Sequence, residues 1–180
     1  MQVKHALCIG NFTLDLTPDG ETPGGSVFYS GATFAALGVR PRIVAAAHPT
    51  FPVDRVRADF DFDLQLRPAS VTTAMRNTYR DGVRTQVLKD AGEGLDVADV
   101  PDGWCEDTIV LLCPVFGEVG PGLARAARGV VTGVSLQGWL RSCDDQQRIV
   151  GTTDVGFLDH LAGVDVLLYS DEDVAHEPAL

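Results

Sequence analysis

Short runs of apolar residues recur along the chain, separated by segments in which apolar and polar positions mix. Continuous apolar runs of about four to eight residues are typical of strands covered on both faces of a parallel sheet. Residues 59–67 instead alternate polar with apolar side chains, which predicts a half-exposed strand. Buried strands are predicted at residues 5–12, 42–47, 108–115, 129–136 and 164–170.

Helices are predicted between these strands. The segment from Ser26 to Leu37 precedes Gly38, and glycine commonly ends a helix. Proline and glycine mark another helix at 120–128, a short one is expected at 156–163, and acidic residues begin a last one at 171–177. Strands that alternate with helices in this way predict an α/β fold, with a mostly parallel central sheet flanked by helices.

Two segments interrupt this alternation. Turn residues crowd the first, and Asp81-Gly82 separates two alternating runs in the second, which is a strong hairpin signal. We expect a small β-strand lid whose strands lie approximately within residues 11–23 and 59–90. No linker separates independent parts, so residues 1–180 are predicted to form a single domain.

The composition narrows the classes of function. The 180 residues carry a formal net charge of −11, which repels phosphate backbones and argues against nucleic acid as a partner. No apolar run approaches membrane-spanning length, so no membrane partner is expected. The four cysteines form no C-x-x-C pair and the first residues do not resemble a signal peptide, so we expect a cytoplasmic protein with reduced thiols.

The stretch "GGSVFYSGATFAALG", residues 24–38, is the strongest candidate for chemistry. A glycine pair before a helix bares backbone N–H groups at the positive end of the helix dipole, a place that suits an anion or a hydroxyl-rich ligand. The pair also fits a turn with a close helix–strand contact. Neither common phosphate-loop pattern, G-x-x-x-x-G-K-[ST] or G-x-G-x-x-G after the first strand, occurs in the chain.

Four motifs in order resemble the ribokinase, or PfkB, family of carbohydrate kinases. They are "IGNFTLD" with the glycine-led segment, "TTAMRNTYRDGVRTQVL", "SLQGWLR" and "VDVLLYSDEDV". The resemblance covers the whole chain and implies a ribokinase-like fold. It also implies phosphoryl transfer from ATP, with Mg²⁺, to the hydroxyl of a sugar.

The resemblance assigns roles to individual residues. A carboxylate at Asp15 would accept hydrogen bonds from sugar hydroxyls, beside the glycine pair. Ser170 and Asp173 stand where the family has Asn and Glu, so Asp173 and its neighbour Glu172 are candidates for organising Mg²⁺ or phosphate; an acidic helix N-terminus explains them equally well. Tyr29 replaces the usual Asn and leaves the sugar open. The substrate-binding residues expected from the resemblance are Asp15, Gly24, Gly25, Tyr29, Arg76 and Gln137.

One family motif is missing. The G-A-G-D segment, which supplies the catalytic base and the backbone donors for the phosphoryl group, does not occur before the chain ends at Leu180. No catalytic residue is therefore assigned, and we expect the sugar-binding portion of a kinase truncated at its C-terminus. Two alternatives stay open: an inactive protein of the same fold that binds a small ligand or a partner, and a nucleoside kinase. A homodimer through the lid strands is also expected from the resemblance.

Overall fold

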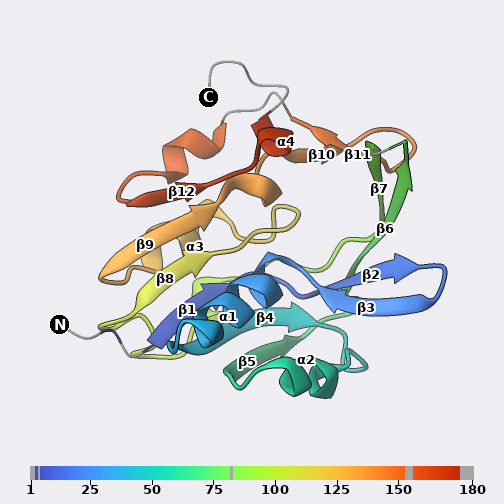
Figure 1. Ribbon diagram of the computed structural model, residues 1–180. Coiled ribbons are helices and arrows are strands. Elements are labelled where there is room, and N and C mark those ends of the chain that lie inside the picture. Colours follow the sequence, from blue (N-terminus) through green and yellow to red (C-terminus); the bar gives the residue numbers. More distant parts are fainter. Residues whose placement is uncertain (1–2, 4, 82, 153–155, 175–180) are drawn as a thin grey trace.

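A computed structural model describes residues 3, 5–81, 83–152 and 156–174 (Figure 1). Its centre is a six-stranded sheet in the order β12-β9-β8-β1-β4-β5, and every neighbouring pair is parallel. The predicted α/β fold with a mostly parallel central sheet is confirmed. The strands are β1 (His5–Ile9), β4 (Arg40–Ala47), β5 (Asp63–Pro68), β8 (Ile109–Leu112), β9 (Val131–Ser135) and β12 (Val166–Leu168).

The central strands are buried because both faces of the sheet are covered. Side chains alternate along β1: Leu7 and Ile9 pack in one apolar cluster with helix α3 (Pro121–Ala126), and Cys8 packs in another on the opposite face. That second cluster includes Val27 of α1 (Ser26–Ala36) and Val56 of α2 (Val53–Asp59). Two layers of helix therefore enclose the sheet, which explains why the apolar runs predicted its strands.

Helix α1 begins and ends where the glycines predict. Its N-cap residue is Gly25, at φ 99°, and its side chain-free backbone turns the chain into the helix. At the other end Gly38 has φ 77°, its N–H donates to Ala35 O, and the N–H of Val39 donates to Phe34 O. These two bonds form a Schellman motif, so glycine ends the helix as expected.

A second sheet of four strands forms the lid, in the order β3-β2-β6-β7. Strands β2 (Thr13–Thr17) and β3 (Gly20–Gly24) form one hairpin, and β6 (Thr73–Arg80) and β7 (Val83–Asp90) form the other. Strand β2 also pairs with β6 in parallel, which joins the two hairpins. In Figure 1 this sheet stands at one end of the large sheet, with β6 and β7 rising beside it.

The structure corrects the expected extent of the lid and adds elements that the sequence pattern did not predict. Strand β5 lies within residues 59–90, but it pairs with β4 in the six-stranded sheet because its apolar residues Leu64 and Leu66 pack on the core. The strand begins at Asp63, after helix α2. The elements without a predicted counterpart are helix α2, the 3-10 helices η1 (Val97–Asp99) and η2 (Leu136–Gly138), and strands β10 (Arg141–Cys143) and β11 (Ile149–Gly151).

Three predicted helices have counterparts in the structure. The helix expected at 120–128 is α3, the short helix expected at 156–163 is the 3-10 helix η3 (Gly156–His160), and the helix expected from Asp171 is α4 (Asp171–Val174). The rest of the segment 171–177, from residue 175 on, lies outside the described residues.

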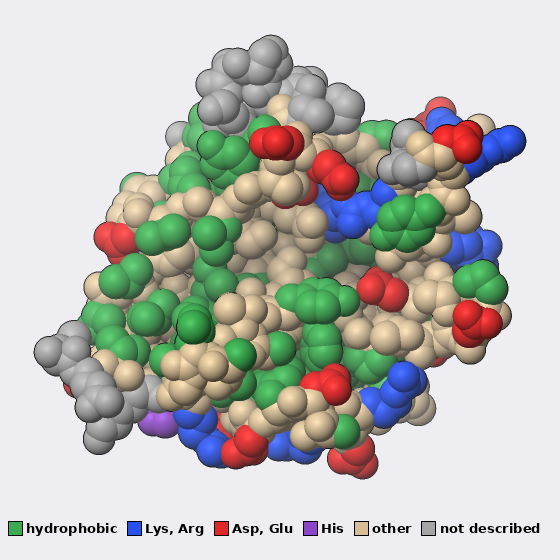
Figure 2. All heavy atoms as spheres, viewed as in Figure 1, with side chains coloured by type: hydrophobic (Ala, Val, Ile, Leu, Met, Phe, Trp, Pro, Cys, Tyr) green, Lys and Arg blue, Asp and Glu red, His purple; other side chains and the backbone are tan. Residues whose placement is uncertain are grey.

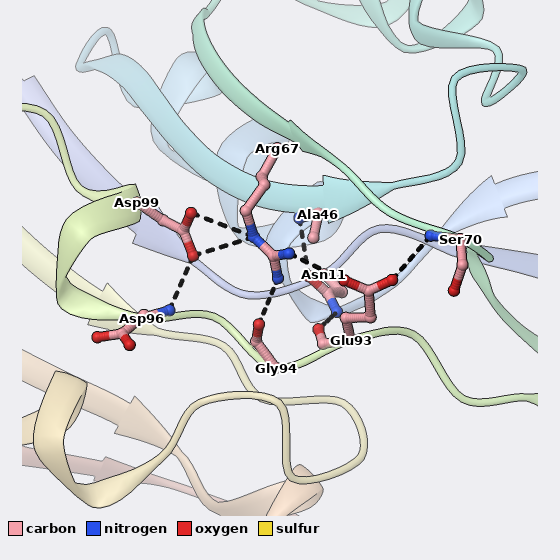
Figure 3. A network of polar contacts seen from close by, with 8 residues as sticks. All are labelled: Asn11, Ala46, Arg67, Ser70, Glu93, Gly94, Asp96 and Asp99. Atoms are coloured by element: carbon pink, nitrogen blue, oxygen red, sulfur yellow. Dashed lines mark hydrogen bonds and ion pairs between the residues drawn. The ribbon is translucent and has the colours of Figure 1, made fainter.

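A polar network fastens the chain where it returns from the lid (Figure 3). Asn11, just after β1, donates from Nδ2 to Glu93 O at 2.9 Å and accepts from Ala46 N at 2.8 Å. Arg67 on β5 pairs with Glu93 at 3.0 Å and with Asp99 at 3.1 Å. The lid is thereby tied to the carboxyl ends of β1, β4 and β5.

The outer strand β12 differs from the centre of the sheet. Its three residues Val166, Leu167 and Leu168 are 42–46% exposed. An exposed apolar edge strand offers unpaired backbone groups to other chains. No helix among the described residues is long and apolar enough to cross a membrane.

Candidate functional site

A cavity of about 440 Å³ lies between the lid and the carboxyl ends of the central strands. Ligands of open α/β sheets bind at this end of the strands. Figure 2 shows the molecule from this side, with a hollow in which basic, acidic and apolar side chains meet. The lid contributes Thr13, Asp15, Met75, Asn77, Tyr79, Arg84 and Gln86; the body contributes Gly25, Ser26, Tyr29, Ser30, Val115, Ser135, Gln137, Arg141 and Leu168.

Asp15 is the acidic group of this cavity. It lies on β2 between Leu14 and Leu16, and the alternation of the strand turns Asp15 to the cavity while Leu14 packs on the apolar core. The carboxylate is half-buried, and no described residue donates a hydrogen bond to it. Burial raises the pKa of Asp15, while the charges of Arg84 and Arg141 act in the opposite direction. A half-buried carboxylate without donors can accept hydrogen bonds from a ligand.

Gly24 lies against this carboxylate. A Cβ on Gly24 would stand 2.8 Å from Asp15 Oδ2 and 3.1 Å from Thr13 Oγ1. Gly24 therefore leaves room for the Asp15 side chain and does not itself line the cavity. Gly24 thus contributes to the cavity through the position that it allows the Asp15 carboxylate.

Gly25 lines the cavity, and the structure supports the second interpretation of the glycine pair, a turn with a close contact. A Cβ on Gly25 would stand 2.9 Å from Asn11 O, and the residue has φ 99°. The close approach is thus to the protein backbone beside β2, and the structure gives a backbone reason for this glycine besides the expected contact with a ligand.

The N-terminus of α1 faces the cavity through Gly25 and Ser26. The first N–H groups of a helix lack acceptors within the helix, and they carry the positive end of its dipole. Ser26 Oγ donates to Gln137 Oε1 at 3.2 Å, which joins α1 to η2. Gln137 follows directly from β9, so the predicted residue is brought to the cavity.

Arg141 is a cation in the cavity wall. It donates to Val115 O at 3.3 Å and to Gln86 Oε1 at 3.1 Å, and Gln86 Nε2 donates in turn to Asn77 Oδ1 at 2.8 Å. No carboxylate of the described residues lies within 4.0 Å of the guanidinium. Burial lowers the pKa of Arg141 to about 10, which leaves the group charged at neutral pH.

Arg84 is the second cation. It lies on β7 and forms an ion pair with Glu172 at 2.8 Å. The Glu172 side chain is 71% exposed, and such exposed pairs are worth little, about 0–1 kcal/mol. The Arg84 guanidinium can therefore exchange this partner for a ligand.

Two other residues were expected to bind substrate, and the structure places Arg76 outside the cavity and Tyr29 in its wall. Arg76 is exposed and does not line the cavity, because Met75, Asn77 and Tyr79 occupy the inward positions of β6 and the intervening residue points the other way. Tyr29 does line the cavity and is 59% exposed. The structure thus brings Asp15, Gly25, Tyr29 and Gln137 together and leaves Arg76 outside.

The candidate Mg²⁺ residues do not converge. Glu172 is paired with Arg84, and Asp173 Oδ2 accepts from both N and Oγ of Ser170, at 2.9 and 2.8 Å. Among the described residues, no three His, Cys, Asp or Glu side chains lie close enough to hold a metal ion. As placed, the two carboxylates serve an ion pair and a helix cap, and their role toward Mg²⁺ or phosphate stays a prediction.

A buried carboxylate that the sequence pattern did not indicate supports the cavity. Glu118 accepts from the backbone N–H groups of Asn11 at 3.0 Å, Val115 at 2.8 Å and Phe116 at 2.8 Å. Burial raises its pKa, and these backbone donors lower it. Glu118 stands alone among apolar residues and glycines in the segment "PVFGEVG", and a single carboxylate in such a loop matches no motif.

No family model and no curated protein sequence matches the chain. Solved structures do match: a pyrophosphate-dependent kinase in the ribokinase family, complexed with a pyrophosphate analog and myo-inositol, has a TM-score of 0.79 at 17% identity over 97% of this chain and 64% of its own. The chain has the ribokinase fold.

Other proteins of the ribokinase fold are similar at comparable identity. A fructokinase from Vibrio cholerae O395 has a TM-score of 0.65 at 15% identity, over 96% of this chain and 66% of that one. The adenosine kinase from Sinorhizobium meliloti has a TM-score of 0.58 at 18% identity, over 76% and 57%. The chain spans less than two thirds of the length of the pyrophosphate-dependent kinase.

Proposed function

We propose that this chain binds a small polyhydroxylated molecule, such as a sugar or a cyclitol, as the acceptor-binding part of a phosphotransferase. The observation that carries the proposal is the half-buried carboxylate of Asp15, which has no donor among the described residues and lies in one cavity with the N-terminus of α1. A charged acceptor forms strong, directional bonds to hydroxyl groups. The cavity volume of about 440 Å³ lies within the range of small-molecule sites.

The polar side chains around Asp15 fit the same ligand. Asn77 and Gln86 on the lid and Ser26 and Gln137 on the body offer both donors and acceptors. Their mutual bonds, Gln86 to Asn77 and Ser26 to Gln137, hold each pair in place before a ligand arrives. Preorganised polar groups lower the entropy that binding costs.

A nucleoside is the second candidate acceptor. Tyr29 and Tyr79 line the cavity with rings that are 59% and 70% exposed, and an exposed aromatic ring can stack on a base. The adenosine kinase among the similar structures is consistent with this alternative. Sugars and nucleosides are separated by the binding panel below.

Two phosphoryl donors are candidates, and no catalytic base is assigned. ATP is expected from the resemblance, and an ATP-bound fructokinase from Xylella fastidiosa is among the similar structures; the pyrophosphate-dependent kinase makes pyrophosphate the other candidate donor. Transfer needs a base within reach of the acceptor hydroxyl and donors for the phosphoryl charge. We assign neither to the described residues, and we propose that the 180 residues bind without transferring phosphate.

The lid strands were expected to pair in a homodimer, and this stays a prediction. Strand β3 is one edge of the lid, and β7 at the other edge meets Arg148 through a bridge at Val87. Within the described part of the lid, β3 is therefore the edge strand that we expect to pair with a second copy of the chain.

The proposal is tested by titration calorimetry with fructose, glucose, myo-inositol and adenosine. Asp15→Asn keeps the shape of the side chain and removes its charge, so we expect a roughly 10- to 150-fold loss of affinity, the equivalent of about 1.5–3 kcal/mol for a hydrogen bond to a charged group. Arg76→Gln, on the outer face of the lid, serves as the control and should bind as the native chain does. Equal affinity of Asp15→Asn and the native chain would contradict the proposal.

Phosphoryl transfer is measured separately. The native chain is incubated with each acceptor, with Mg²⁺, and with ATP or pyrophosphate. Release of ADP or phosphate that depends on the acceptor would show that the chain carries its own base, contrary to the proposal.

A further inference from the structure

The charges that line the cavity do not match the charge of the protein. The chain carries a formal net charge of −11, yet the charged residues that line the cavity are Asp15, Arg84 and Arg141. Two cations thus face one carboxylate in the lining of the cavity, and one of the cations, Arg84, has a partner in Glu172. A neutral polyol alone gives no reason for this excess of cations.

Arg141 carries most of that excess. Two of its bonds go to neutral oxygens, Val115 O and Gln86 Oε1, and no described carboxylate is within 4.0 Å. A guanidinium has five N–H donors, so three stay available to another partner. Asp173, Glu118 and Glu172 attract this partly buried cation from beyond contact distance. An anion in direct contact would form the charge-assisted bonds that these three do not make.

Asp15 cannot be that anion. Strands β2 and β7 are separated by β6, which places Asp15 and Arg84 on strands about 9–10 Å apart. No hydrogen bond or ion pair joins Asp15 to either arginine among the described contacts. The acceptor for hydroxyl groups and the cations thus stand apart in one cavity, with room between them for a ligand that uses both.

Building on the proposed function, we infer that the molecule bound here carries an anionic group, a carboxylate or a phosphate, in addition to its hydroxyls. Arg141 binds the anionic group with its free donors. Arg84 leaves the exposed Glu172 and adds a second guanidinium, which suits the planar, bidentate geometry of carboxylate and phosphate. Asp15 accepts from hydroxyls at the other side, and it would repel an anion placed beside it, so the two charges also fix the direction in which the ligand lies.

Titration calorimetry with matched ligands tests this inference. Glucose, gluconate and glucose 6-phosphate form one series, and fructose with fructose 6-phosphate or myo-inositol with a myo-inositol monophosphate form two others. We expect an anionic member to bind at least about 10-fold more tightly than its neutral parent, as the value of one charge-assisted pair suggests. The gluconate and phosphate arms show which anion the site takes.

Arg141→Gln removes the charge and keeps donors for Val115 O. We expect it to abolish the preference for the anionic ligand while affinity for the neutral parent stays within about threefold. Arg76→Gln makes the same charge change outside the cavity and should retain the preference. An equal loss for neutral and anionic ligands would show that Arg141 only braces the lid against the body, and would overturn the inference.

Other outcomes separate the inference from the proposed function. If neutral polyols bind through Asp15 and anionic ones bind no better, the inference fails and the proposed function stands. If phosphate and pyrophosphate bind but no polyol does, the arginines serve a phosphoryl donor, and both fail. If Arg141→Gln does not fold, two other measurements test the inference: the affinities of Arg84→Gln, and the salt dependence of binding by the native chain. Affinity for the anionic ligand must fall as the NaCl concentration rises, and affinity for the neutral ligand must not.

Discussion

The six-stranded sheet and the lid differ in which residues they leave open to solvent. At the centre of the large sheet, β1, β4 and β8 bury nearly every side chain on both faces. Strand β6 of the lid buries only its first three residues, and its outer half is exposed on both faces. The large sheet therefore provides the stability, and the lid, anchored at one end, provides side chains that a ligand can reach. Substitutions in the two sheets should separate stability from binding.

The largest effect is expected for Gly10→Val, in the large sheet. A Cβ at Gly10 would stand 2.2 Å from Cys113 O, and backbone on the neighbouring strand cannot move aside. We expect the free energy of unfolding to fall by more than about 4 kcal/mol, measured by urea denaturation, or the protein to be insoluble. Gly122→Ala in α3, where a Cβ meets nothing within 4 Å, is the control and should leave stability unchanged or slightly higher. A normally folded Gly10→Val would contradict the close packing of β1 on β8.

A glycine of the lid should behave differently. Gly24→Ala places its Cβ 2.8 Å from Asp15 Oδ2, and a side chain can rotate away where backbone cannot. We expect a stability loss within about 1.5 kcal/mol and a loss of polyol affinity of roughly tenfold, since a displaced carboxylate forfeits about one charged hydrogen bond. Calorimetry and urea denaturation on the same preparation give both values. A variant that unfolds would show that the lid is as tightly packed as the body.

Acidification should weaken binding before it weakens the fold. Burial raises the pKa of Asp15, so its charge is lost at a higher pH than for an exposed aspartate, and polyol affinity should fall as pH decreases through that raised pKa. The linkage to stability has the opposite sign. Burial disfavours the charged form of Asp15 in the folded protein. This cost to stability is present above the pKa of Asp15 in the folded state and disappears below its pKa in the unfolded state. Asp15→Asn should therefore be slightly more stable than the native chain at neutral pH.

Both parts of this prediction have a direct measurement. Affinity from pH 7 to pH 4 is compared for the native chain and Asp15→Asn, and only the native chain should show the decline. Urea denaturation at pH 7 gives the stability difference. A less stable Asp15→Asn would mean that the carboxylate has a donor in the folded protein.

The smallest effect is expected at the edge of the large sheet. Leu167 on β12 is 43% exposed, so Leu167→Thr removes little buried surface and should change the free energy of unfolding by less than about 0.5 kcal/mol. The same change should slow aggregation, measured by light scattering, because the edge becomes less apolar. A large loss of stability would show that β12 is packed as firmly as the central strands.

Apolar pattern predicts the large sheet well because burial on both faces leaves a continuous signal. Strands β1, β8, β9 and β12 fall within predicted runs, and β4 begins at Arg40, two residues before the run predicted at 42–47. Helix α2 gave no such signal, since only Val56 among its seven residues is buried. Val56 of this helix packs in one apolar cluster with Phe60 and Phe62. The alternation of these two residues with aspartates predicted a strand from residue 59, four residues before β5 begins at Asp63.

The motifs predicted cavity residues from two distant parts of the chain: Asp15, Gly25 and Tyr29 near the N-terminus, and Gln137 far from them. Asp15 and Gly25 belong to one short segment, and the resemblance found both. Arg141 ends the quoted segment "SLQGWLR" but was not singled out there. Its bond to Gln86, 55 residues earlier, depends on the packing of β10 beside the lid, which a local motif does not show. Arg76 shows a different limit: in a strand, a shift of one position turns a side chain to the other face, so the inward residues are Met75 and Asn77.

The parallel pairing of β2 with β6 has a consequence for the order of folding. Thr13 pairs with Thr73, and the chain between them contains α1, β4, α2 and β5. Closing so long a loop costs conformational entropy that the lid's few buried contacts cannot repay alone. We therefore expect the body up to β5 to form before the two hairpins meet, and the ligand site to be among the last parts of the chain to fold.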